Sequence, residues 1–216
     1  MSNDELQTSV EDELRWEPRV DSPAIAVDAH DGSVTLRGTV GSLREKFEAK
    51  KVAKRVYGVK SVDDQLQVRI LGENSRDDAE LRGAVLQALM LNSEVPSSVD
   101  TTAVNGVVTL SGTVEHQFER EEAESVASKV LGVTSIDDQI ELLPPGPSAH
   151  DVHHSIKKAL ERNAKLDADG ISVESAHGTV KLSGVVESWA EHDAAVDAAW
   201  SAPGVTTVDD KIIIDY

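Results

Sequence analysis

The sequence predicts an α+β protein of three tandem small domains, each ordered helix, strand, strand, helix, strand, with a three-stranded mixed sheet covered by two helices. The first observation behind this prediction is a glycine that recurs at two nearly equal intervals along the chain: Gly38, Gly112 and Gly184. The second is a pair of aspartates that recurs at the same two intervals: Asp63-Asp64, Asp137-Asp138 and Asp209-Asp210. A unit of this length can hold its own helices and strands, so it is a small domain and not a solenoid repeat.

The repeats set the expected domain boundaries. We expect repeat 1 at residues 4–70, repeat 2 at 77–143 and repeat 3 at 148–216, with linkers at 71–76 and 144–147. The glycine-containing first linker should be flexible, and the proline-rich second linker should be stiffer. The chain contains no cysteine, so each domain relies on its apolar core and not on disulfides.

The first helix and the hairpin follow from two periodicities. In each repeat an apolar residue recurs every four positions, which predicts one buried helical stripe: Leu6, Val10, Leu14; Leu81, Val85, Leu89; Val152, Ile156, Leu160. Alternating apolar residues then flank a two-residue turn of Asp31-Gly32, Asn105-Gly106 or His177-Gly178. Such pairs tolerate positive φ at both central positions, so each predicts a type I′ hairpin.

Each repeat should contain a second helix with one buried side, which in repeat 3 consists of alanines. In repeat 1 this side is Ala49, Val52, Ala53 and Val56. In repeat 3 it is Ala195, Ala198, Ala199 and Ala202, a thinner core that Trp189 and Trp200 are expected to compensate. We expect the helix of repeat 1 to end at Gly58, because glycine readily adopts the left-handed geometry of a C′ position.

The last strand closes each sheet. In repeat 1 it should run through Val62, Leu66 and Val68, and because strand-helix-strand crossovers are right-handed it should pair parallel to the strand before the helix. Gly38 and its two equivalents should lie where the preceding strand turns into the helix. A close backbone approach or positive φ explains these glycines without a ligand.

The repeated segments resemble a known family. The segments 34–40, 108–114 and 180–186 read Val-Thr-Leu-Arg-Gly-Thr-Val, Val-Thr-Leu-Ser-Gly-Thr-Val and Val-Lys-Leu-Ser-Gly-Val-Val, and each is followed by Gly-Val-x-x-Val/Ile-Asp-Asp. With the element order, they resemble the BON domain in three copies over nearly the whole chain. The resemblance implies a non-catalytic, transport-associated module of bacterial osmotic-stress and envelope physiology, often with phospholipid binding. Such domains also occur in secretins and in a cytoplasmic potassium-binding protein, and the resemblance implies no residue-level site.

The net charge of −18 is spread unevenly. Repeat 1 carries −2, repeat 2 carries −10 and repeat 3 carries −6. Repeats 2 and 3 would repel phosphates, which excludes nucleic acid as their partner. Repeat 1 is the one repeat suited to an anionic surface.

The second helix of repeat 1 is the candidate binding site. Its cations are Arg44, Lys46, Lys50, Lys51, Lys54 and Arg55. They could bind an anionic phospholipid surface or another protein. The alternatives are a solvated face, or pairing with the acidic second helix of repeat 2, which carries Glu119, Glu121, Glu122 and Glu124.

The aspartate pairs are low-ranking cation candidates. Each pair follows an apolar residue and is expected just before the last strand, where turn formation or protection of an edge strand explains it. The alternative is a monovalent or divalent cation held by Asp63, Asp64, Asp137, Asp138, Asp209 and Asp210 with nearby carbonyls.

The remaining sequence patterns argue against a catalytic or metal-binding site. No nucleophile, histidine and carboxylate recur together, so we expect neither an enzyme nor a cofactor. His150, His153 and His154 occur in one repeat alone, which favours a solvated helix start over a metal site. Neither a signal peptide nor a membrane span is visible, which predicts a cytoplasmic protein, or a periplasmic one if Met1 is not the natural start. Two functions remain open: peripheral phospholipid association, and a cytosolic potassium-type cation sensor or protein-interaction scaffold.

Overall fold

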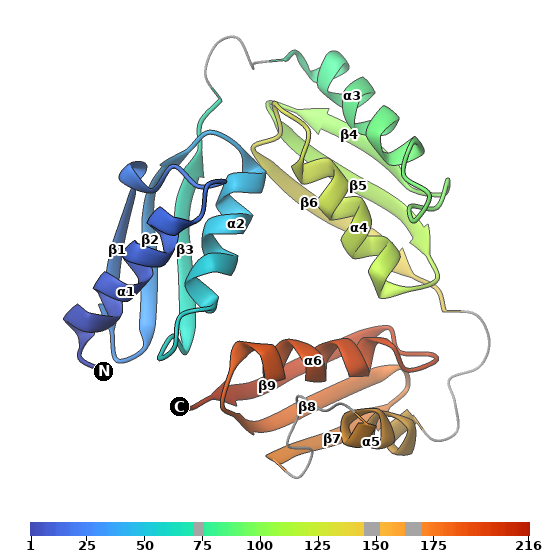
Figure 1. Ribbon diagram of the computed structural model, residues 1–216. Coiled ribbons are helices and arrows are strands. Elements are labelled where there is room, and N and C mark those ends of the chain that lie inside the picture. Colours follow the sequence, from blue (N-terminus) through green and yellow to red (C-terminus); the bar gives the residue numbers. More distant parts are fainter. Residues whose placement is uncertain (71–75, 145–151, 163–169) are drawn as a thin grey trace. The chain divides into compact units, whose positions relative to one another are not determined.

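The three repeats share one order of elements in the computed structural model, which describes residues 1–70, 76–144, 152–162 and 170–216 (Figure 1). Repeat 1 consists of α1 (Asn3–Trp16), the short 3-10 helix η1 (Ser22–Ala24), β1 (Ile25–His30), β2 (Ser33–Val40), α2 (Leu43–Lys54) and β3 (Ser61–Val68). Repeat 2 consists of α3 (Asp78–Met90), β4 (Asp100–Val104), β5 (Val107–Val114), α4 (Gln117–Ser128) and β6 (Ser135–Leu142). Repeat 3 consists of α5 (Val152–Arg162), β7 (Ile171–Ala176), β8 (Thr179–Val186), α6 (Trp189–Trp200) and β9 (Thr207–Ile214).

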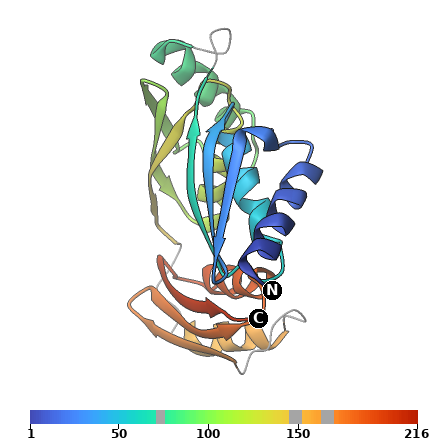
Figure 2. The same cartoon turned by 90° about the vertical axis from the view of Figure 1, so that its left-hand side faces the viewer.

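The predicted α+β class is confirmed. Each sheet has three strands, ordered β1-β2-β3, β4-β5-β6 and β7-β8-β9. In repeats 1 and 3 the hairpin pairs antiparallel and the last strand pairs parallel to the central strand, so Gly38 lies opposite Leu66 and Gly184 opposite Ile212. The two helices of repeat 1 cover the same face of its sheet (Figures 1 and 2).

Local sequence chemistry sets where the elements begin. Ser2 caps α1 with a capping box, because its hydroxyl accepts from the Glu5 N–H while the Glu5 carboxylate accepts from the Ser2 N–H. Both residues of each hairpin turn adopt positive φ, as a type I′ turn requires: the first residues are Asp31 (49°), Asn105 (52°) and His177 (50°).

The helical stripes form the cores. Leu6, Val10 and Leu14 are buried against the sheet in repeat 1, and the matching residues are buried in repeats 2 and 3. In repeat 3 the expected compensation is present, since Trp189 and Trp200 pack against the alanine-rich core. In the described part of the chain, no helix is both long and apolar enough to cross a membrane.

Two expectations about glycine positions are wrong. Gly38 lies inside β2, before its last two residues, and a Cβ there would come within 2.1 Å of the Ala24 carbonyl oxygen. The close approach explains the glycine, but the strand does not end there. α2 ends at Lys54 with Arg55 as its C-cap, so Gly58 is not the C′ residue. After Lys54, backbone N–H groups bond to the carbonyl three residues earlier, as Val56 N–H does to Ala53 C=O. This 3-10 pattern replaces the α-helical one before the chain reaches Gly58.

Several predicted features lie outside the described residues. These are most of the first linker (71–75), most of the second linker (145–147) and His150.

Candidate functional site

The six cations of the candidate site do not form one uniform surface. Arg44, Lys51 and Arg55 are exposed, whereas Lys46, Lys50 and Lys54 are half-buried. Their side-chain hydrogen bonds and ion pairs divide them into cations that interact within repeat 1 and cations that have no partner among the described residues.

Lys46 ties α2 to the last strand. Its Nζ donates to the Leu66 carbonyl oxygen at 2.6 Å and lies 3.7 Å from Asp64 Oδ1. The same aspartate oxygen accepts from the Leu66 backbone N–H at 3.0 Å. Lys46 therefore neutralises the second aspartate of the pair inside the repeat.

The other repeats contain the same ion pair between the second helix and the last strand, which we call the helix–strand ion pair. The cation is Arg120 in repeat 2, bound to Asp138, and His192 in repeat 3, whose Nε2 lies 2.7 Å from Asp210 Oδ2. Lys46, Arg120 and His192 recur at the same two intervals as Gly38 and its equivalents. A basic side chain at this position is therefore part of the fold.

His192 makes this ion pair sensitive to pH in repeat 3. Its Nδ1 lies 3.0 Å from Asp193 Oδ1, and its ring packs edge-on against Trp189 at a centroid distance of 4.9 Å. The hydrogen bond to Asp193, together with the charge of Asp210, raises the pKa of His192 above its usual value although partial burial opposes this.

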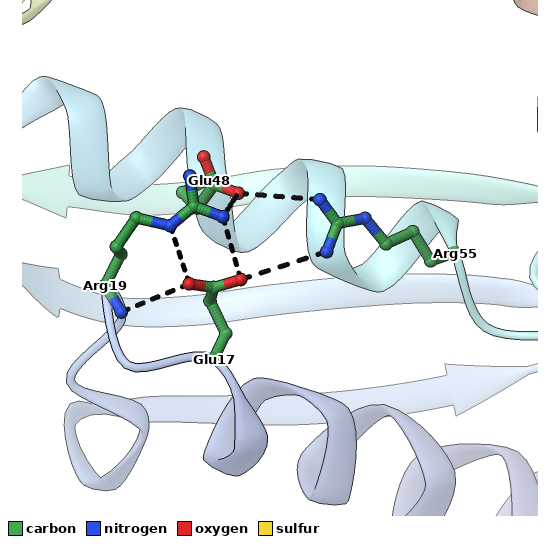
Figure 3. Close-up of polar contacts among 4 residues, drawn as sticks. All are labelled: Glu17, Arg19, Glu48 and Arg55. Atoms are coloured by element: carbon green, nitrogen blue, oxygen red, sulfur yellow. Dashed lines mark hydrogen bonds and ion pairs between the residues drawn. The ribbon is translucent and has the colours of Figure 1, made fainter.

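Arg55 belongs to a second network, shown in Figure 3. Arg19 lies between Glu17 and Glu48, with N···O distances of 2.6 and 2.7 Å, and Arg55 reaches the same two carboxylates at 3.8 and 3.7 Å. Hydrogen bonding to Arg19 lowers the pKa of Glu17 to about 2. The network joins the loop after α1 to α2, so Arg55 serves the structure of repeat 1.

Three of the six cations remain for a partner. Among the described residues, the side chains of Arg44, Lys50 and Lys51 make no hydrogen bond or ion pair, whereas Lys54 does interact within the chain. Phe47, whose side chain is 38% exposed, lies one helical turn from both Arg44 and Lys51. We call Arg44, Phe47, Lys50 and Lys51 the cationic face of α2.

The equivalent helix faces of the other repeats carry the opposite charge. When the repeats are aligned on their glycines, Phe47 corresponds to Glu121 in repeat 2 and to Asp193 in repeat 3. Lys50 corresponds to Glu124, whose pKa is raised because of burial and the nearby charge of Asp138. The cationic face is thus a property of repeat 1 and not of the fold.

The aspartate pairs lie inside the last strands, as the predicted course of that strand through Val62 and Leu66 implies, and not just before them. Asp63 and Asp64 belong to β3, and the other two pairs belong to β6 and β9. The first aspartate of each pair bonds along its own strand: Asp63 with Gln65 at 2.6 Å, Asp137 with Gln139 at 2.7 Å and Asp209 with Lys211 at 2.9 Å. Among the described residues, no three acidic or histidine side chains are grouped so that they could hold a metal ion.

Sequence reasoning missed the partner of the second aspartate. It treated Lys46 as one of six equivalent surface cations and did not single out Arg120 or His192. The signal was present, because a basic residue recurs at the same two intervals as the aspartates that it binds.

Sequence comparison identifies the family. The sequence pattern of the BON domain matches residues 2–70, 77–144 and 150–216. The chain belongs to the BON domain family. Over 147 residues it is 37% identical to the osmotically-inducible protein Y of Escherichia coli strain K12, which covers 65% of this chain and 72% of that protein.

Two of the solved structures that the chain resembles are distant from it in sequence. CdsD, described as a structural protein of the type III secretion system of Chlamydia trachomatis, is 16% identical with a TM-score of 0.28, over 98% of this chain and 92% of that one. The PrgH periplasmic domain is 12% identical with a TM-score of 0.24, over 95% of this chain and 99% of that one. Scores this low carry no argument about function.

Proposed function

We propose that this BON-domain protein is a non-catalytic, stress-related binding module that associates peripherally with anionic phospholipid through the cationic face of α2. One observation carries the proposal: the side chains of Arg44, Lys50 and Lys51 have no partner among the described residues and lie within about one helical turn of the exposed Phe47. The relative named for osmotic induction supports a role in bacterial stress physiology.

The physical basis is the charge and the aromatic ring together. Each cation near an anionic bilayer contributes about 1 kcal/mol, so three contribute roughly two orders of magnitude in partitioning. An aromatic ring between them can enter the headgroup region, where such rings are favoured. The −10 of repeat 2 opposes binding, which limits association to a geometry that turns repeat 1 toward the membrane.

Liposome flotation tests the proposal. The chain should float with vesicles that contain phosphatidylglycerol at low salt and should not float with phosphatidylcholine alone. The variant R44E/K50E/K51E should lose flotation. The matched control K157E/K158E/R162E makes the same charge change on exposed positions of α5 and should retain it. Equal flotation of the two variants would contradict the assignment of the site.

The cation-sensor alternative has less support in the geometry. Asp64, Asp138 and Asp210 are each neutralised by a side chain of their own repeat, and the first aspartates bond along their strands. Calorimetry with potassium, sodium and calcium separates the two functions. Selective heat with one ion would favour the sensor, and equal behaviour in all three ions would favour the phospholipid proposal.

A further inference from the structure

The first helix of repeat 2 has apolar side chains on two sides. Leu81, Val85 and Leu89 of α3 are buried in the core. Outside the core, Met90 is 77% exposed and Leu91, directly after the helix, is 79% exposed. A surface helix normally buries one apolar stripe and exposes polar residues elsewhere, so a second apolar side is unusual. The fold of repeat 2 therefore leaves an apolar surface of α3 uncovered.

A groove of about 350 Å³ lies next to this surface, between the C-terminal half of α3 and the loop that leads to the edge strand β4. Its lining is mainly apolar: Leu86, Met90, Val95, Pro96 and Val99, with Asp100 at one side. This volume is at the lower end of the range for ligand pockets. It suits the apolar side chains of a bound segment.

Repeat 1 shows that the fold does not require an apolar groove. The equivalent groove, between α1 and β1, has a volume of about 290 Å³ and contains Glu11 and Arg15. These two residues correspond to Leu86 and Met90 when the buried stripe of α1 is aligned with that of α3. Repeat 2 has thus replaced two charged groove residues by apolar ones while keeping the same architecture.

The charges around the groove limit what it can bind. Residues 77–143 contain 13 acidic and 3 basic residues, and two of those cations, Arg82 and Arg120, are paired with Asp100 and Asp138. An anionic bilayer would be repelled from this repeat. An apolar segment that carries lysine or arginine on its flanks would be attracted.

The edge of β4 favours a helical ligand over an added strand. The Thr101 N–H donates to Asp100 Oδ1 at 2.7 Å, and the Thr101 carbonyl accepts from Arg82 Nε at 2.8 Å. These side chains occupy backbone groups that an incoming strand would need. We propose that the α3–β4 groove of repeat 2 binds a basic amphipathic helix of a partner protein, with its apolar face against Leu86 and Met90.

A labelled synthetic helix with leucine on one face and lysine on the other tests this, by fluorescence anisotropy with the full chain at physiological salt. A version with glutamate in place of lysine should bind far more weakly. The variant L86E/M90R copies the groove of repeat 1 without changing net charge, and it should weaken binding of the lysine peptide by about tenfold or more. R44E/K50E/K51E should leave the peptide affinity unchanged, which separates this proposal from the phospholipid proposal.

Three results would overturn the inference. The first is unchanged peptide affinity of L86E/M90R, which would show general attraction to an acidic surface. The second is loss of vesicle binding in this variant, which would make the groove a lipid site. The third is a changed small-angle scattering profile of the unliganded variant, which would show that another part of the chain covers the groove. If L86E/M90R does not fold, M90R/L91E, at two largely exposed positions, serves the same test.

Discussion

Repeats 1 and 3 both contain the helix–strand ion pair, but the cation is a lysine in repeat 1 and a histidine in repeat 3. Lys46 holds Asp64 at 3.7 Å in repeat 1, and His192 holds Asp210 at 2.7 Å in repeat 3. Lysine stays charged through the physiological range, whereas histidine loses its charge within it. A basic side chain occupies this position in each repeat, and we expect its identity to decide whether the stability of the repeat depends on pH.

The cores of the two repeats differ in a similar way. Val52 is fully buried in repeat 1, where repeat 3 has alanines on the same helix and fills the space with Trp189 and Trp200 from the two ends of α6. The architecture tolerates this exchange because it fixes the volume to be filled and not the residue that fills it.

The largest expected effect comes from a feature that both repeats share. Gly38→Ala would place a Cβ within 2.1 Å of the Ala24 carbonyl oxygen, and Gly184→Ala would place one within 2.1 Å of the Gly170 carbonyl oxygen. Each change should destabilise its own repeat by about 3 kcal/mol or more, because strained backbone and steric overlap add. Thermal unfolding followed by circular dichroism checks this.

Gly83→Ala is the control for these glycines. A Cβ at Gly83, within α3, meets no heavy atom within 4 Å, so the change should stabilise repeat 2 by roughly 0.5–1 kcal/mol. Unchanged unfolding of Gly184→Ala would show that the Gly170 carbonyl moves away at little cost, and the shared backbone approach would then not be essential.

The second prediction tests whether tryptophan fills the core of repeat 3. Trp200→Ala removes a half-buried ring that packs on the core of repeat 3 and should cost about 2 kcal/mol, part of the roughly 3–5 kcal/mol of a buried tryptophan. Trp16→Ala in repeat 1 removes a side chain that is 86% exposed and should change stability by less than about 0.5 kcal/mol. Equal losses in chemical denaturation would contradict the compensation of the thin core by Trp200.

The parts of the fold that could be predicted depend on interactions between residues close together in the sequence. The stripe of Leu6, Val10 and Leu14 and the turn at Asp31-Gly32 are local patterns, and both are confirmed. The end of α2 was predicted wrongly because Gly58 satisfies a local rule that hydrogen bonds at Arg55 and Val56 override. Propensity rules identify which residues suit a helix end, and packing decides which one is used.

The sequence predicted which cations the candidate site contains, but not which of them form ion pairs within the repeat. The cations of α2 are visible in the sequence, yet the roles of Lys46 and Arg55 depend on Asp64 in β3 and on Glu17 after α1. Contacts across elements require the register of the sheet and the crossing of the helices. Comparing the repeats supplies part of this information, since Lys46, Arg120 and His192 recur at the same intervals as their aspartates.

The third prediction uses pH to separate the two repeats. The pKa of His192 is raised in the folded state, so its contribution to stability is fully present below the unfolded pKa of about 6.5 and is lost as pH rises through the higher folded pKa. Repeat 3 should therefore lose about 1 kcal/mol across this range, while repeat 1 should not. Because Trp189 contacts the His192 ring, its fluorescence should report the transition.

Two variants sharpen this result. His192→Lys replaces the titrating cation by the residue of repeat 1 and should abolish the pH dependence of repeat 3. Asp210→Asn removes one anionic partner and should lower the pKa of His192. Parallel pH profiles of the wild type and His192→Lys would show that another group causes the loss of stability.

The smallest effect concerns the hairpin turns, whose geometry is nearly the same although their first residues differ. His177 in repeat 3 has a φ of 50° and Asn105 in repeat 2 has a φ of 52°. Asparagine tolerates the left-handed region better than histidine, because its short side chain can hydrogen-bond to the local backbone. His177→Asn should therefore stabilise repeat 3 by about 0.5 kcal/mol, and Asn105→His should destabilise repeat 2 by about the same amount. Opposite shifts of similar size in the unfolding of the two repeats would show that backbone conformation alone sets the preference. A loss of stability in His177→Asn would show instead that the imidazole makes a contact on which repeat 3 depends.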